Sequence, residues 1–533
     1  MIRILFLIAA ALFATPAHAQ WREATSRNFI VYSDGDERGL REAVIRLERY
    51  NHALRALSNV TRPPSATKLK VYLLRNVSVL SQFAGQGPAG YYVASARGPI
   101  AVSIRRGPRT VSTLAVTTRE DTNAAAEEVL LHEYAHHFMF QNFPATYPWW
   151  FVEAFAGFYG PAIIRDDGGV EIGHGAMWRQ DALREGWLPI HRILTARRPQ
   201  DINGEVGLLY AQGWLTVHYL FNQRGGAAQL QRYLEAVNAG TSYEAAVEAV
   251  WGPQARELDS ALRRYAREPL RALHLPFRPI DIGPVEVRAL SAAENDLLFT
   301  EIHLGSGISR AYVGRFSQSV RSLAGRYSGD PYALRILAEA ERLAGNRAQA
   351  EQAVNRLLAI RPEDPKGLLF RGLLNVDALR ESNSRDEAAW NAARAPLLRA
   401  NRLAPNDAQV LLAYYDSYRG QDSLPPAHAQ NALVRAMNLV PQDDLIRYRV
   451  AADYERRDMI EEAIFTIRPD AYATHEDENE AARRRRERNY ERYGPAGEER
   501  RETAREMLTR LETRLAQQRG TATPPAPAPA PAQ

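Results

Sequence analysis

The sequence predicts an α+β domain followed by an all-α solenoid of helical repeats. Three patterns predict this fold class: alternating strand and helix patterns over residues 21–120, mostly helical patterns from 123 to 270, and a recurring helix-turn-helix pattern after about residue 311. Because one hydrophobic core rarely extends beyond roughly 250–300 residues, a chain of 533 residues needs at least two domains.

The domain boundaries follow from shifts in composition and pattern along the chain. We expect five segments, in this order: a signal peptide at 1–19, an α+β domain at 20–270, a linker with a strand or two at 271–310, helical repeats at 311–475, and a charged helix with a disordered Pro/Ala-rich tail at 476–533.

The first nineteen residues, MIRILFLIAAALFATPAHA, have the parts of a secretory signal peptide. Arg3 precedes an apolar run from Ile4 to Phe13, and small residues end the segment at Ala17 and Ala19. This run is well short of the ~20 residues that a membrane-spanning helix needs, which argues against an anchor. We therefore expect cleavage before Gln20, secretion across the inner membrane, and no transmembrane span after cleavage.

The composition excludes several kinds of site. The chain has no Cys, so a disulfide, a thiol nucleophile and a Cys-type metal site are ruled out, and any metal must be held by His and carboxylates. The net charge of +5 comes almost entirely from Arg, because Lys occurs only at Lys68, Lys70 and Lys366. Acidic residues are interspersed almost throughout, so we expect no nucleic-acid partner.

The elements of the first domain are predicted by local periodicity. Within 37–57, five apolar residues recur on one helical face: Leu40, Val44, Leu47, Tyr50 and Leu54. Other patterns predict strands at 28–34 and 68–76, a hairpin at 89–106, and helices at 123–143, 149–159, 207–223 and 227–239.

The second half repeats a helix-turn-helix pattern of about 34 residues. The clearest copy places small and large apolar residues, a Gly and a final Pro in a regular order: Leu334, Leu337, Ala338, Gly345, Ala350, Val354, Leu357 and Pro362. Further copies end at Pro405 and Pro441, 43 and 36 residues on, and a weaker fourth runs through YERRDMIEEAIFTIRPDA. The pattern resembles a tetratricopeptide repeat; the alternative is a generic helical bundle.

The chemistry centres on HEYAH, residues 132–136. His132 and His136 are four residues apart and lie on one face of a helix, where two imidazoles can reach one Zn²⁺. Glu133 follows the first of them and can act as general base toward a zinc-activated water. A single-metal site also needs a third protein ligand. The alternative is a pair of core histidines beside a surface glutamate.

Glu153 is the candidate third ligand. It is the lone charged residue in the stretch from Gln141 to Ile164, within the apolar segment WWFVEAFAGFYG. Burying an unpaired carboxylate costs several kcal/mol, so Glu153 needs a partner, and a zinc ion is an adequate one. Two antiparallel helices joined by a short loop would bring Glu153 to His132 and His136.

Other residues near this motif are weaker candidates. His137 lies about 100° further around the helix, which favours a packed or hydrogen-bonded histidine over a ligand. Tyr210, in LLYAQGW, is the best candidate for stabilising an oxyanion, with a core tyrosine as the alternative. His174 and His218 are less favoured for that role, since His218 sits in an apolar helix and His174 in a Gly-rich loop.

HEYAH followed by WWFVEAFAGFYG resembles the pattern of gluzincin zinc metallopeptidases. More closely, these segments, with WREATSRNFIVYSDG, LLYAQGWLTVHYLF and AGTSYEAAVEAVWG, resemble the peptidase-MA-like (DUF1570-type) bacterial proteins, whose peptidase domain is often followed by tetratricopeptide repeats. The resemblance covers roughly residues 21–270. It implies a zincin-like fold with His132, His136 and Glu153 as zinc ligands and Glu133 as general base. It also implies a periplasmic location and a substrate-pairing sheet edge at GPIAVSI. Ala154 departs from the family pattern, which usually has Gly there.

The sequence therefore predicts a secreted zinc metallopeptidase that hydrolyses protein or peptide substrates, with repeats that bind substrate or a protein partner. One alternative is a non-catalytic periplasmic interaction protein in which the zincin-like domain is structural. Another is a zinc hydrolase that acts on a different bond, such as an amide of the cell wall.

Overall fold

The computed structural model describes residues 20–84, 90–105, 119–143, 145–175, 177–197, 199–276, 281–419, 423–472 and 502–520. The expected signal peptide and the Pro/Ala-rich tail lie outside these residues. In the described part, no helix is both long and apolar enough to cross a membrane.

The first domain is built on a six-stranded mixed sheet in the order β4-β5-β3-β2-β1-β9. Its strands are β1 (Arg22–Thr25), β2 (Phe29–Ser33), β3 (Leu69–Leu74), β4 (Gly90–Val93), β5 (Ile100–Ile104) and β9 (Glu286–Ala289). Strands β2, β3 and β5 run parallel, whereas β4, β1 and β9 are antiparallel to their neighbours. A second, antiparallel sheet contains β6 (Ile163–Ile164), β7 (Val170–Ile172) and β8 (Leu273–Leu275).

Helices cover both faces of the large sheet. They and the remaining helices of this domain are α1 (Glu37–Leu57), α2 (Val77–Ala84), α3 (Arg119–Asn142), α4 (Trp149–Tyr159), α5 (Met177–Glu185), α6 (Ile190–Thr195), α7 (Val206–Asn222), α8 (Gly226–Asn238), α9 (Tyr243–Val250) and α10 (Ala255–Tyr265). Two 3₁₀ turns span Pro199–Ile202 and Gly252–Gln254. The predicted helix at 37–57 is confirmed as α1, and its five periodic apolar residues are all buried.

Strand β3 shows how the sheet is buried on both sides. Val71 faces a core shared with α1 and α3, whereas Tyr72, the next residue, faces a core shared with α2 and the helix α11 (Ala292–Ser306). Successive side chains of a strand point to opposite faces, so this apolar run is buried throughout. Strand β5, at the predicted edge GPIAVSI, lies inside the sheet; that prediction is wrong, because β4 forms the edge.

The segment predicted as a linker, 271–310, does more than connect. It contains the expected strands β8 and β9, but β9 pairs with β1 and α11 covers one face of the large sheet. The opposite side of α11 packs against the first repeat helices through Ala293, Leu297 and Leu304. This helix is therefore buried on two sides and joins the two halves of the molecule.

The C-terminal half is an array of helical hairpins, as the sequence predicted. After α11 come α12 (Val313–Gly325), α13 (Pro331–Leu343), α14 (Arg347–Ile360), α15 (Pro365–Glu381), α16 (Glu387–Leu403), α17 (Ala408–Asp416), α18 (Ala427–Leu439), α19 (Asp444–Arg456), α20 (Ile460–Tyr472) and α22 (Ala504–Gln518). The 43-residue spacing of the second copy reflects the longer helices α15 and α16. Successive helix pairs share successive cores, which is the organisation of a solenoid.

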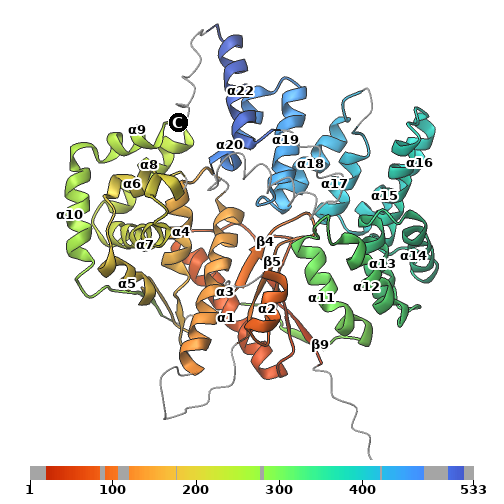
Figure 1. Cartoon of the computed structure of the whole chain (residues 1–533), viewed down its shortest axis with the longest axis horizontal. Coiled ribbons are helices and arrows are strands. Elements are labelled where there is room, and N and C mark those ends of the chain that lie inside the picture. Colours follow the sequence, from red (N-terminus) through yellow and green to blue (C-terminus); the bar gives the residue numbers. More distant parts are fainter. Residues whose placement is uncertain are drawn as a thin grey trace, which may run out of the picture.

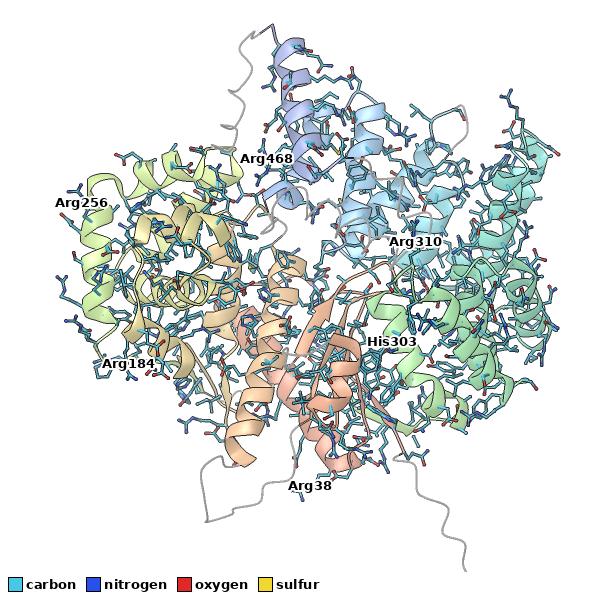
Figure 2. All side chains as sticks on the ribbon, in the orientation of Figure 1. Arg38, Arg184, Arg256, His303, Arg310 and Arg468 are labelled. Carbon is cyan, nitrogen blue, oxygen red and sulfur yellow. The ribbon has the colours of Figure 1, made fainter. Side chains whose placement is uncertain are left out.

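The solenoid forms an arch that returns to the first domain (Figure 1). Arg97, after β4, pairs with Glu339 of α13 at 2.6 Å. At the far end of the arch, Arg468 of α20 donates to the carbonyl oxygen of Asn238 at 3.0 Å (Figure 2). The first domain and the repeats thus contact each other at several separate points.

Candidate metal centre

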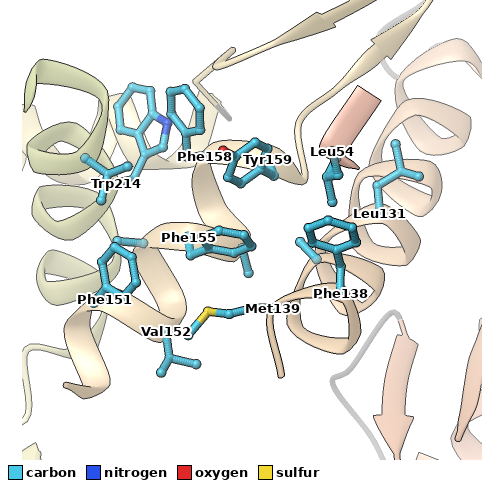
Figure 3. Packing of buried hydrophobic residues seen from close by; sticks show 14 of the residues in the cluster. Leu54, Leu131, Phe138, Met139, Phe151, Val152, Phe155, Phe158, Tyr159 and Trp214 are labelled. Carbon is cyan, nitrogen blue, oxygen red and sulfur yellow. The ribbon is translucent and has the colours of Figure 1, made fainter. Parts of the chain in front are cut away.

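Helices α3 and α4 form a hairpin around an aromatic core (Figure 3). Phe138 and Met139 of α3 pack with Phe155 and Tyr159 of α4, and α7 adds Trp214 from the other side. Every residue of α4 except Glu153 is buried. An apolar helix with one polar side chain must therefore place that side chain where a polar partner exists.

The hairpin brings His132, His136 and Glu153 together. The Nε2 atoms of the two histidines are 3.2 Å apart. Oε2 of Glu153 lies 3.6 Å from Nε2 of His132 and 3.8 Å from Nε2 of His136. These separations suit a single ion at the roughly 2.0–2.2 Å distances of Zn–N and Zn–O bonds. In the part of the chain that the structure describes, this is the one group of at least three His, Asp or Glu side chains so arranged.

The chemistry of this donor set fits a zinc ion. Two imidazoles and one carboxylate are the protein ligands of a known class of catalytic zinc site. The side chains of His132, His136 and Glu153 keep 21%, 13% and 15% of their surface exposed, so solvent can reach them. A structural zinc site would instead be closed by a fourth protein ligand.

Small residues allow the two helices to approach at the ligands. A Cβ at Gly160, just after α4, would lie 2.9 Å from the Cα of His132, which is closer than a side chain tolerates. On the other side of α4, Ala154 faces Gly213 of α7, where a Cβ would lie 3.3 Å from the methyl carbon of Ala154. Gly213 thus provides the room that the methyl group of Ala154 requires.

Glu133 and Tyr210 both belong to the surroundings of this cluster. Burial raises the pKa of Glu133, the charge of His132 lowers it, and the charge of Glu153 raises it. Burial also raises the pKa of Tyr210, as do the carboxylates of Glu153 and Glu133, while a hydrogen bond with Trp149 lowers it. The phenol of Tyr210 is therefore electrostatically coupled to the carboxylates of the site.

Arg179 is a site residue that the sequence reasoning missed. It lies on α5, is 4% exposed, and places Nη1 3.3 Å from Oε1 of Glu128. Burial lowers the pKa of Arg179, whereas the charges of Glu128 and Glu153 raise it, so Arg179 interacts electrostatically with the candidate ligand Glu153. A Cβ at Gly157 would lie 3.2 Å from Nη2 of Arg179, so the arginine crosses α4 where that helix has no side chain.

A signal for Glu128 was present in the sequence, since it precedes His132 by four residues and shares its helical face. No local pattern marks Arg179, because its role depends on how α5 packs against α4.

The other histidines are placed away from the cluster. His137 is buried and its Nδ1 is 3.0 Å from the hydroxyl of Tyr92, and burial lowers the pKa of His137 to about 4. His218 is buried against Tyr265, with its Nδ1 2.8 Å from the hydroxyl. Both placements agree with the predicted structural roles.

His174 lies 3.0 Å from Oε2 of Glu171, on the side of the domain that carries β7. It lines a cavity of about 720 Å³ that none of the three candidate ligands lines. Neither His174 nor His218 joins the metal centre.

The chain is similar to several solved structures at low identity. A thermophilic TPR protein of Thermus thermophilus is 18% identical, with a TM-score of 0.30 over 42% of this chain and 99% of its own. PilF of Pseudomonas aeruginosa is 13% identical, with a TM-score of 0.29 over 43% of this chain and 93% of its own. MamA AMB-1 is 18% identical, with a TM-score of 0.23 over 33% of this chain and 95% of its own. No family model matches the chain, and no curated protein matches it.

Proposed function

We propose that the chain is a secreted, periplasmic zinc-dependent metallopeptidase of the gluzincin type with a zincin-like first domain. The observation that carries the proposal is the convergence of two imidazole nitrogens and one carboxylate oxygen within 3.8 Å of one another. The mixed sheet with its antiparallel edge strand β4, and the coupling of Tyr210 to the site carboxylates, add support.

Each residue of the site has a distinct role in peptide hydrolysis. His132, His136 and Glu153 would hold a Zn²⁺ ion, which supplies Lewis acidity and lowers the pKa of a water molecule. Glu133 would accept the proton from the attacking water and deliver it to the leaving amine. Tyr210 would donate a hydrogen bond to the oxyanion that develops from the scissile carbonyl.

The repeats would contribute by binding protein or peptide. A solenoid presents an extended surface for such partners. If the metal centre were only structural, the repeats would carry the function, and the chain would be a non-catalytic periplasmic interaction protein.

Turnover of casein by the zinc-loaded chain tests the proposal. We expect cleavage by the wild type and loss of cleavage in Glu133→Gln with its zinc content unchanged. Glu42→Gln, which alters an exposed carboxylate on α1, serves as the matched control and should cleave normally. Purified peptidoglycan run beside casein separates a peptidase from a cell-wall amidase. A zinc-loaded wild type that cleaves neither substrate would leave the interaction protein as the function.

A further inference from the structure

The repeats reach the first domain within one turn of the metal ligands. Gln442 lies between α18 and α19, and its Nε2 donates to the carbonyl oxygen of His137 at 3.4 Å and to Oε1 of Gln141 at 3.3 Å. Both acceptors are on α3, the helix that carries His132 and His136. The repeat domain therefore touches the catalytic helix itself.

A cavity of about 280 Å³ lies at this junction. Its first-domain wall is mainly apolar and includes Tyr92, Val93, Phe140, Tyr147 and Val152. Its other wall comes from the repeats and includes Pro441, Gln442, Asp444, Arg447 and Pro469. Neither domain alone would enclose this space.

The cavity lies beside the candidate metal centre, although none of the three candidate ligands lines it. Phe140 follows His136 by one helical turn, and their ring centroids are 6.5 Å apart. Val152 directly precedes Glu153 on α4. Strand β4 supplies Tyr92 and Val93 and is the edge of the sheet, where a peptide in extended conformation can add its backbone hydrogen bonds.

The charged residues on the repeat wall are Asp444, Arg447 and Asp470. Arg447 of α19 and Asp470 of α20 both belong to the repeat wall, and Nε of Arg447 lies 3.3 Å from Oδ1 of Asp470, so these two charges balance each other. A dry cavity of roughly 150 Å³ holds a benzene ring, so this one has room for a leucine or phenylalanine side chain. Oε1 of Gln442 is buried and has no hydrogen-bond partner among the described residues.

We propose that this cavity is a specificity pocket that takes one large apolar side chain of a peptide substrate, with the repeats as its outer wall. The inference rests on the proposed peptidase function and deepens it. In this view the repeats form part of the substrate cleft, in addition to any separate partner that they bind.

Binding of capped heptapeptides to the zinc-loaded, full-length Glu133→Gln protein tests the pocket without turnover. Each peptide in the series replaces one Ala of the same parent by Phe. We expect Phe at one position to bind about tenfold more tightly than Ala, since filling an apolar pocket gives discrimination of that order.

The variant Asp444→Trp narrows the cavity from the repeat side and should abolish this tenfold preference. Glu387→Trp is the matched control, because Glu387 is likewise the first residue of a repeat helix capped by an Asp but is exposed and does not line the cavity. Ala145→Trp narrows the cavity from the first-domain side and covers the case in which Asp444→Trp fails to fold.

The outcomes separate the pocket from the peptidase function. A Phe preference that disappears in Asp444→Trp or Ala145→Trp but persists in Glu387→Trp supports the pocket, even if the wild type cleaves none of the peptides. Absence of any Phe preference, or a preference that both narrowing variants retain, overturns the pocket, even if the wild type cleaves the peptides efficiently.

Discussion

Two groups of polar side chains in this chain are largely withdrawn from solvent, and they balance their charges in different ways. One is the group of His132, His136 and Glu153 between α3 and α4. The other surrounds Glu301, on α11, at the junction of the sheet and the repeats.

The Glu301 group contains its own counter-charges. Lys70 of β3 lies 2.8 Å from Oε1 of Glu301, and the hydroxyl of Tyr332 donates to Oε2 at 2.6 Å. Burial raises the pKa of Glu301, but the charges of Lys70 and Arg335 and the hydrogen bonds from Lys70 and Tyr332 together lower it by more. The pKa of Glu301 therefore lies well below its usual range. The protein alone stabilises this carboxylate.

The candidate metal centre is arranged differently. Its three converging atoms can each act as a metal ligand, and the charge of Glu153 raises the pKa of Arg179. A divalent cation completes such an arrangement, whereas a Lys or Arg already completes the first. This difference indicates that the group around Glu301 serves to join two domains, whereas the group of His132, His136 and Glu153 is suited to hold an ion.

The largest expected effect comes from removing the third ligand. Glu153→Ala should lose zinc, because two histidines alone bind it too weakly, and the content should fall below ~0.1 ion per chain. Elemental analysis after reconstitution and buffer exchange measures this, with one ion per chain expected for the wild type and for Glu301→Gln. Full zinc content in Glu153→Ala would contradict the assigned ligand.

Next in size is Glu301→Gln, which leaves Lys70 without its carboxylate partner in a largely buried site. We expect a loss of about 3 kcal/mol in the free energy of unfolding, since breaking a buried pair leaves an uncompensated charge. Urea unfolding of the zinc-free protein measures it. Glu42→Gln, which breaks the exposed pair with Arg38, should change stability by less than about 0.5 kcal/mol.

Tyr210, beside the candidate metal centre, and Tyr332, beside Glu301, should affect different properties: the first kcat and the second stability. Tyr210→Phe should lower kcat for casein about 100-fold with little change in stability, because in the proposed mechanism its hydroxyl donates to the oxyanion. Tyr332→Phe should lower stability by about 1 kcal/mol and leave kcat unchanged, because it removes one hydrogen bond to Glu301. Equal kcat values for Tyr210→Phe and wild type would show that Tyr210 has only a structural role in the core.

A smaller effect is expected for Arg179, whose pKa the charge of Glu153 raises and which we expect to influence zinc binding through that carboxylate. Arg179→Met keeps the apolar part of the side chain but removes the charge that neighbours the ligand. We expect a zinc affinity about tenfold weaker, as for other residues that orient ligands from outside the coordination shell. Competition with a chromophoric chelator gives the affinity, and an unchanged value would make Arg179 purely structural.

The smallest effect concerns acid pH. The pKa of Glu301 is depressed in the folded state, so its contribution to stability is present above the unfolded-state pKa and is lost as pH falls toward the folded value. With an unfolded pKa near ~4.3, the stability difference between wild type and Glu301→Gln should be constant above about pH 5 and about 1 kcal/mol smaller at pH 3.5. Urea unfolding across this pH range measures the difference. If Glu301 did not pair with Lys70, the stability difference between wild type and Glu301→Gln would not change with pH.

Local patterns predicted much of this molecule correctly. The helices at 149–159, 207–223 and 227–239 are found as α4, α7 and α8, and the repeat helices follow the predicted order. The spacing of His132 and His136 and the isolation of Glu153 were enough to name the three side chains that the structure brings together. These features depend on side-chain periodicity within one or two helices.

What the sequence could not supply depends on contacts between distant segments. The pairing of β1 with β9, the two buried sides of α11, the crossing of Arg179 over Gly157, and the cavity beside Gln442 all join residues far apart along the chain. Helix periodicity and ligand spacing reflect interactions over a few residues, so they can be recognised in the amino-acid sequence. Sheet order, domain docking and the surroundings of a buried charge arise only when the cores pack, because their energies depend on which surfaces exclude water together.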